Sequence, residues 1–173
     1  MIWNNFIYIN FFQLAANNNN EDILSFLILQ NGVIEPKCFE KCYKLTKIKI
    51  PFSVKSIGSD AFSECKSLTM IDIPSSITSI GQNAFYGCKS LESIKIPSSI
   101  VSIEQNTFYK CKSLTMIDIP SSITSIGQNA FYGCKSLESI KIPSSIVSIE
   151  QNTFYKCKSL TMIDIPSSIT SIG

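Results

Sequence analysis

The chain has 173 residues and a formal net charge of +2, which fits one compact domain or one short stack of repeats and excludes a strong whole-molecule field for anionic partners. Hydrophobic residues make up 45% of the sequence and charged residues 16%, so a core can be buried. All 15 basic residues are lysines, and because specific nucleic-acid recognition favours arginine, we expect none here. The sequence contains no histidine, so we also expect no imidazole metal ligand.

The N-terminal segment, residues 1–16, is apolar but is interrupted by asparagines and a glutamine. It is too short and too polar to span a bilayer, so we predict no transmembrane segment there. Ala15 and Ala16 fit a signal-peptide cleavage site, although the segment lacks the expected basic residue near its start. A secretory signal and a degenerate cap followed by an asparagine-rich linker both remain open. We predict an N-terminal segment at 1–24 and repeats over 25–173.

An internal repeat of 23 residues dominates the rest of the chain. Cysteine, phenylalanine and proline each recur six times at this spacing. The predicted units are 25–47, 48–70, 71–93, 94–116, 117–139 and 140–162, followed by a partial unit at 163–173. A second period of 46 residues is superimposed, because residues 69–114 are identical to residues 115–160.

Each unit follows the spacing of a leucine-rich repeat, as at Leu68, Ile71 and Ile73. Alternating apolar residues predict a strand over 70–73, which the following proline ends because it has no N–H to donate to a sheet. The segment 81–88 predicts a single helical or 3-10 turn. Stacking these units predicts a parallel sheet with strands about 4.8 Å apart.

The unit I-D-I-P-S-S-I-T-S-I-G-Q-N-A-F-Y-G-C-K-S-L resembles the BspA-like leucine-rich repeat family of surface-antigen type over residues of about 33–173. The resemblance implies an α/β fold, a right-handed leucine-rich-repeat solenoid with a parallel sheet on the concave face and short helical or 3-10 turns on the convex face. It also implies a cell-surface role in adhesion. The chain departs from the family pattern at Glu104 and Glu150, where glycine is common, and at Thr107 and Thr153, where alanine is common.

The cysteine column predicts buried free thiols. Equivalent residues of stacked strands lie about 4.8 Å apart with parallel Cβ vectors, which does not suit a disulfide. Cys38 and Cys42 are a special pair that could bridge or hold a metal, but two ligands do not complete a zinc site. We therefore expect no metal and no cofactor. The phenylalanine column predicts core packing, with the rings face to edge.

Two sets of charged residues recur along the chain. On the outer side of the predicted strands, lysine and aspartate alternate, and such a ladder neutralises itself. In a second set, lysines recur at the same position of successive units, with tyrosines nearby. This set predicts one of two things: an edge that binds an acidic polymer or glycan, or a solvated edge preserved by copying. Its candidate ligand-binding residues are Lys66, Lys89, Lys110, Lys112, Lys135, Lys156, Lys158, Tyr86, Tyr109, Tyr132 and Tyr155.

Catalysis is not expected. The chain has no nucleophile–histidine pair, no phosphate-binding loop and no metal cluster, and its polar residues recur as columns where a catalytic site needs different groups converging at one place. The favoured function is a non-catalytic protein-binding or adhesion module, at a cell surface or secreted, with a protein or glycan ligand. The alternatives are a cytoplasmic interaction scaffold and a duplicated gene fragment without a defined role.

The C-terminal strand carries a further expectation. Ile163 and Ile165 would form an uncapped edge strand in the partial last unit. An unpaired edge is a template for association with another chain, so we expect either a fragment or self-association through this end.

Overall fold

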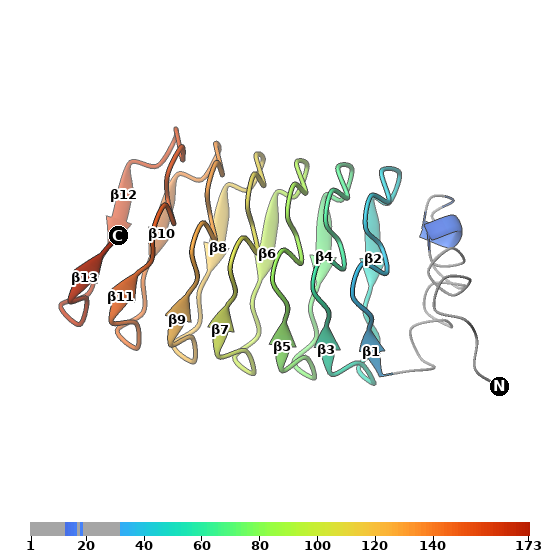
Figure 1. The fold of residues 1–173 in the computed structure, drawn as a ribbon, viewed down its shortest axis with the longest axis horizontal. Coiled ribbons are helices and arrows are strands. Elements are labelled where there is room, and N and C mark those ends of the chain that lie inside the picture. Colours follow the sequence, from blue (N-terminus) through green and yellow to red (C-terminus); the bar gives the residue numbers. More distant parts are fainter. Residues whose placement is uncertain (1–12, 17, 19–31) are drawn as a thin grey trace.

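The computed structural model describes residues 13–16, 18 and 32–173 (Figure 1). Residues 13–16 are helical, and residues 32–173 wind into a stack of similar coils. The predictions of a signal or cap, of the linker and of a boundary at residue 24 fall mainly outside the described residues. No helix in the described part of the chain has the length and apolar character needed to cross a membrane.

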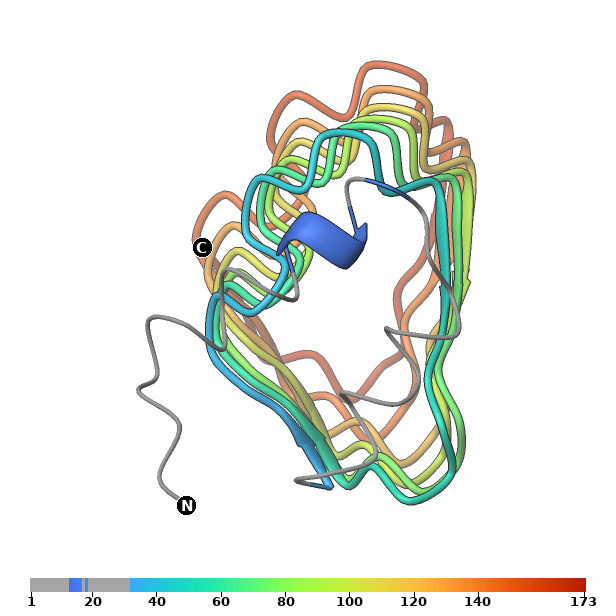
Figure 2. The ribbon, with the colours of Figure 1, turned by 90° about the vertical axis from the view of Figure 1, so that its right-hand side faces the viewer.

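Each coil contributes two short strands, and the coils stack so that like strands lie side by side (Figures 1 and 2). We call the side formed by the three-residue strands face 1; it comprises β2 (Lys47–Lys49), β4 (Met70–Asp72), β6 (Ser93–Lys95), β8 (Met116–Asp118), β10 (Ser139–Lys141) and β12 (Met162–Asp164). Face 2 comprises β1 (Val33–Ile34), β3 (Ser56–Ile57), β5 (Ser79–Ile80), β7 (Ser102–Ile103), β9 (Ser125–Ile126), β11 (Ser148–Ile149) and β13 (Ser171–Ile172). All paired strands are parallel.

Face 1 is the sheet that the sequence predicts. In β4 the isoleucine Ile71 points inward and is buried, whereas Met70 and Asp72 point outward and are exposed. This follows from the two-residue period of a strand. Pro74 stands just beyond the strand, as predicted. Face 2 is a second parallel sheet that the sequence analysis did not anticipate, because two residues of S-I are too few to show a period.

The core between the faces is built from columns of the repeated apolar residues. Phe39, Phe62, Phe85, Phe108 and Phe131 are fully buried, as are the inward leucines of the same units. Successive phenylalanine rings lie 5.0–5.7 Å apart between centroids with interplanar angles of 2–8°. The rings are stacked in parallel, so the prediction of face-to-edge packing was wrong. Neighbouring units are nearly translated copies, and translation keeps the rings parallel.

The turn segment of each unit is not the predicted helical turn. Its N–H groups alternate between two kinds of acceptor: Ala84 donates to Gly81 O in its own turn at 3.2 Å, whereas Phe85 donates to Thr107 O in the next unit at 3.0 Å. The alternation requires backbone reversals, and Asn83 has a φ of 58°, in the left-handed region. The predicted parallel-sheet solenoid is confirmed, but its turns bond to neighbouring coils as well as to themselves.

Apart from the additional pairing of β1 with β3, hydrogen bonding between the described strands alternates between complete and incomplete along the stack. On face 1, three residue pairs join β2 to β4, β6 to β8 and β10 to β12. Only Met70 and Ser93 pair between β4 and β6, and β8 and β10 belong to separate sheets. On face 2, β5 is not paired with β7, nor β9 with β11. The coils therefore form doublets, which we define as β2–β5, β6–β9 and β10–β13.

The doublets follow from one position in the repeat. Gly81 donates its N–H to Ile57 O of the preceding coil at 2.8 Å. A Cβ at Gly81 would lie 2.6 Å from Ser59 N, which is too close for any side chain. Glu104 and Glu150 occupy the same position in alternate units. Their side chains prevent this close approach, so the strands that directly precede them, β7 and β11, do not pair with the coil before.

Candidate functional site

The repeated tyrosines form a column on the outside of the turn segments. The rings of Tyr86 and Tyr109 stack at 4.8 Å with an interplanar angle of 4°, and those of Tyr109 and Tyr132 at 4.5 Å with 11°. Tyr155 lies 5.3 Å from Tyr132 and is tilted by 47°. The first three rings are half-buried, and Tyr155 is 55% exposed. Stacking holds these rings in place without hiding them from solvent.

Two of the candidate lysines lie over this column. Lys110 Nζ is 5.0 Å from the centroid of Tyr109, and Lys156 Nζ is 5.3 Å from that of Tyr132 and 5.2 Å from that of Tyr155. These distances suit a cation–π contact. A hydrogen bond with the Tyr132 hydroxyl raises the pKa of Lys156. We call Tyr86, Tyr109, Tyr132, Tyr155, Lys110 and Lys156 the tyrosine–lysine edge.

Four other candidate lysines form a second column on the turn that follows each cysteine. They are Lys89, Lys112, Lys135 and Lys158. The backbone keeps them in register, since Ser113 N–H donates to Lys89 O at 3.1 Å and Ser136 N–H donates to Lys112 O at 3.1 Å. Lys89 and Lys112 are half-exposed, and the other two are exposed. No ion pair to this column is found within residues 32–173.

Lys66 differs from the other candidates. Its Nζ lies 3.2 Å from Glu64 Oε2 and 4.6 Å from the centroid of the Tyr43 ring. The N-terminal end of the lysine column is therefore neutralised by a neighbouring carboxylate. The structure thus brings Lys110 and Lys156 to the tyrosines, keeps the second column beside them, and pairs Lys66 within its own unit.

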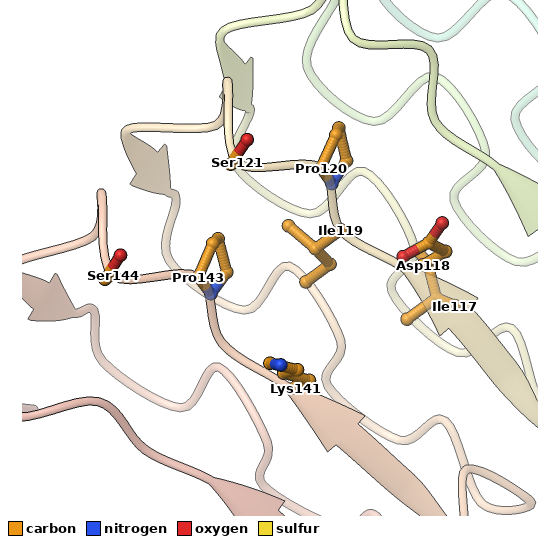
Figure 3. Close-up of a pocket in the computed structure, with 8 residues that line it drawn as sticks. All are labelled: Ile117, Asp118, Ile119, Pro120, Ser121, Lys141, Pro143 and Ser144. Carbon is orange, nitrogen blue, oxygen red and sulfur yellow. The ribbon is translucent and has the colours of Figure 1, made fainter.

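Two shallow hollows lie where the strands of face 1 end. One, of about 390 Å³, lies between Asp118 and Lys141 and is rimmed by Pro120 and Pro143 (Figure 3). The other, of about 410 Å³, includes Lys49 and Asp72 among its lining residues. Sequence reasoning identified the charges but not the hollows, because it treated the I-P-S segment only as the end of a strand.

The second hollow has one exposed aromatic side chain. Phe52, 72% exposed, stands where the later units have serine, and it lines the hollow together with Pro51. This departure from the repeat was the signal available in the sequence. An open hollow of this kind, with an aromatic wall, two lysines and one aspartate, suits contact with a polypeptide surface better than enclosure of a small molecule.

The sequence profile of the BspA type leucine rich repeat region matches residues 32–134 and 102–173 in six copies. The chain belongs to the BspA type leucine-rich repeat family. The sequence-based resemblance is confirmed, and membership of this family supports the interpretation of the molecule as a repeat module for protein interaction. Solenoids of this family are generally non-catalytic.

Solved structures of other proteins share the fold. The leucine-rich repeat protein of T. pallidum is 32% identical with a TM-score of 0.78 over 82% of this chain and 66% of its own. A leucine-rich repeat protein of Bacteroides ovatus is 28% identical with a TM-score of 0.53 over 78% of this chain and 46% of its own. The pneumococcal vaccine antigen PcpA, 24% identical with a TM-score of 0.56, shares the fold over 73% of this chain and 29% of its own.

This BspA type chain covers less than two thirds of each of those three structures. No curated protein matches it. The comparisons therefore establish the family and the fold, and the ligand has to be inferred from the residues of this chain.

All seven cysteines of this BspA type repeat are free thiols, and all except Cys157 are buried, as the sequence predicts. Cys38 and Cys42, the pair considered for a bridge or a metal, are both free as well. Burial raises the pKa of Cys111 and of Cys134 well above the ordinary value for a thiol. Within the described residues, His, Cys, Asp and Glu side chains do not gather in threes as a metal site would require.

Proposed function

We propose that the chain is a non-catalytic adhesion or protein-binding module displayed at a cell surface, and that the tyrosine–lysine edge makes the contact. The observation that carries the proposal is the stacked tyrosine column with Lys110 and Lys156 over its rings. Aromatic side chains already fixed by packing lose little conformational entropy on binding, and tyrosine is enriched among the residues that dominate binding energy. The edge is therefore preorganised for contact.

The positive charge of the edge and of the second lysine column favours an acidic ligand. In that column, the lysines at 89, 112, 135 and 158 lie one strand spacing apart, and their mutual repulsion is unfavourable in the free protein. An acidic protein segment or an acidic glycan would relieve this repulsion and release counterions. The tyrosine hydroxyls beside the lysines add hydrogen-bond donors and acceptors. We infer a ligand with regularly spaced carboxylates or sulfates.

A binding experiment with a charge-matched control tests the edge. The edge variant combines Lys110→Gln and Lys156→Gln of the tyrosine–lysine edge with Lys112→Gln of the second lysine column. The control combines Lys49→Gln, Lys95→Gln and Lys141→Gln on face 1. Poly-glutamate and heparin serve as probes, measured by fluorescence anisotropy at several NaCl concentrations. We expect the edge variant to bind at least about tenfold more weakly and with a shallower dependence of log K on log salt. Equal loss in both variants would show only a general charge effect and contradict the edge.

The location is tested separately. We expect an antibody against the chain to label intact source cells without permeabilisation. Labelling only after permeabilisation would favour the alternative, an interaction scaffold inside the cell. The thiols do not discriminate between the two locations, since their burial keeps them protonated and free in either setting.

A further inference from the structure

Face 1 carries two outward columns whose residues alternate from one strand to the next. In the first column, Met70, Met116 and Met162 are 59%, 64% and 65% exposed on β4, β8 and β12, and serines occupy the same place on β6 and β10. In the second column, aspartate follows on the methionine strands and lysine on the serine strands. From β4 to β12, a bulky apolar side chain and a negative charge thus share one strand, and a small side chain and a positive charge share the next; β2 differs in having Lys47 in the first column.

The two columns are held in register by the sheet. Lys49 pairs with Asp72, Lys95 with Asp118, and Lys141 with Asp164 across the paired strands. The predicted charge ladder is therefore present, yet none of these side chains forms an ion pair within residues 32–173. The methionines are large, exposed and regularly spaced, and flexible methionine surfaces are a common feature of protein interfaces. Face 1 is charged, apolar and open at the same time.

We propose that face 1 is the interface of a dimer with a second copy of this chain, docked face to face about a two-fold axis parallel to the strands. With the axis between β6 and β8, each strand that bears an outward aspartate lies over a strand that bears the corresponding lysine (Figure 1 shows the six strands side by side). Lys95 then faces Asp118 of the other copy, and Met116 faces the gap left by Ser93. The charges of the second column are matched on all six strands, whereas in the first column Lys47 of β2, and not a serine, faces Met162.

The other arrangements of the two copies lack this match. An axis along the stack places the methionine column over the charged column. An axis that passes through one strand places aspartate over aspartate and lysine over lysine, which is repulsive. Packed sheets also tend to keep their strands within about 30° of each other, which the proposed axis satisfies. Charge and shape therefore select the same geometry, and the partner that fits best is an identical chain.

The size of the face limits the affinity. Five strand spacings of about 4.8 Å and three residues of about 3.3 Å give a plan area of roughly 240 Å². A stable interface buries about 800 Å² on each partner, so we expect this dimer to be weak. Such an association matters where copies are crowded, as on a surface, because a second contact then becomes effectively intramolecular.

A charge-swap experiment tests the interface. The acidic variant carries Lys49→Glu, Lys95→Glu and Lys141→Glu, and the basic variant carries Asp72→Lys, Asp118→Lys and Asp164→Lys. Sedimentation velocity at chain concentrations from 10⁻⁵ to 10⁻³ M measures association of each protein alone and of their equimolar mixture. We expect the wild type to dimerise, each variant alone to associate at least tenfold more weakly, and the mixture to associate at least as strongly as the wild type.

The control variant carries Lys112→Glu, Lys135→Glu and Lys158→Glu, which change the net charge as much as the acidic variant but lie off face 1. It should dimerise at least as well as the wild type. Far-UV circular dichroism confirms that each variant is folded. A wild type that stays monomeric throughout, or a mixture that does not recover association, would overturn the proposal. Because binding at the tyrosine–lysine edge is measured with separate variants, either proposal can fail alone.

Discussion

The thiol of Cys111 donates a hydrogen bond to the carbonyl oxygen of Phe85 at 3.2 Å, and the same oxygen accepts the N–H of Cys88 at 3.2 Å. The thiol pattern recurs along the column, as in Cys88 to Phe62 O at 3.1 Å. Five cysteines therefore pack against apolar neighbours and donate to a carbonyl of the preceding unit: Cys65, Cys88, Cys111, Cys134 and Cys157. The column is a structural element of the core, and this role leads to two predictions.

The first concerns thiol reactivity. Cys157 is half-buried, whereas the other six cysteines are fully buried. This partial burial raises the pKa of Cys157 to about 11. At pH 8 we expect a thiol-specific reagent to label Cys157 slowly and the other six only after unfolding, because the thiolate is the reactive form. Mass spectrometry of labelled peptides, with and without denaturant, checks the order. Rapid labelling of Cys111 in the folded protein would contradict the buried column.

The second concerns pH. Since the folded-state thiol pKa values are raised, the folded chain holds protons that the unfolded chain releases above about pH 8.5. The contribution of the thiols to the free energy of unfolding should therefore be constant below that pH. Above it, the free energy of unfolding should fall by up to about 1.4 kcal/mol per pH unit for each thiol. Urea unfolding between pH 7 and 10 measures the slope. A Cys111→Ala variant, itself destabilised by about 1 kcal/mol, should show a smaller slope.

The third prediction contrasts the two aromatic columns. Phe108 is fully buried between two stacked neighbours, so Phe108→Ala should cost about 3–5 kcal/mol of unfolding free energy. Tyr109 is half-exposed on the turn segment, so Tyr109→Ala should cost about 1 kcal/mol or less. Chemical denaturation of both variants measures the difference. Equal costs would mean that the tyrosine column is part of the core and not available for ligands.

The fourth prediction concerns the junction between doublets. Glu104→Gly should let β7 approach β5 and add hydrogen bonds worth about 0.5–1.5 kcal/mol each, less the entropy cost of glycine. Amide hydrogen exchange near residue 104 should slow. The reverse change, Gly127→Glu, should destabilise the chain by about 2 kcal/mol, because a Cβ there meets Gln105 N at 2.6 Å and the bond to Ile103 O is lost. Similar stabilities for the two variants would contradict the role of this position.

Much of the fold could be predicted because the same residue types recur at equivalent positions of every unit, so each unit gives the same structural prediction. Leu68, Ile71 and Phe62 recur at 23 residues, and only a stacked coil gives every copy the same buried neighbours. The strand around Met70 was predicted to within one residue at its C-terminal end. The lysine and tyrosine columns could likewise be placed on one side of the stack, although their binding role stays a prediction.

The remaining features depend on contacts between coils, which a single unit does not encode. The alternating donors of the 81–88 turn and the parallel phenylalanine rings appear only when one coil lies on the next. The substitution of glutamate for glycine at residue 104 was visible, but its effect on strand pairing required the distance to the backbone beneath it. Phe52 could have been noticed as a break in the serine pattern, whereas the hollow beside it could not.

The hydrogen-bonded doublet spans two 23-residue units, the same length as the duplicated 46-residue block. Removing or inserting one such block would leave only junctions of kinds that the chain already contains. Insertion of a single glutamate-bearing unit beside another would instead place two such coils in direct succession, a junction that residues 32–173 do not contain, whereas two glycine-bearing coils already follow each other at Gly58 and Gly81. The length of the solenoid can thus change in steps of about 9.6 Å, which is two strand spacings, without any new kind of contact between coils. Length is the property that this architecture leaves free to vary.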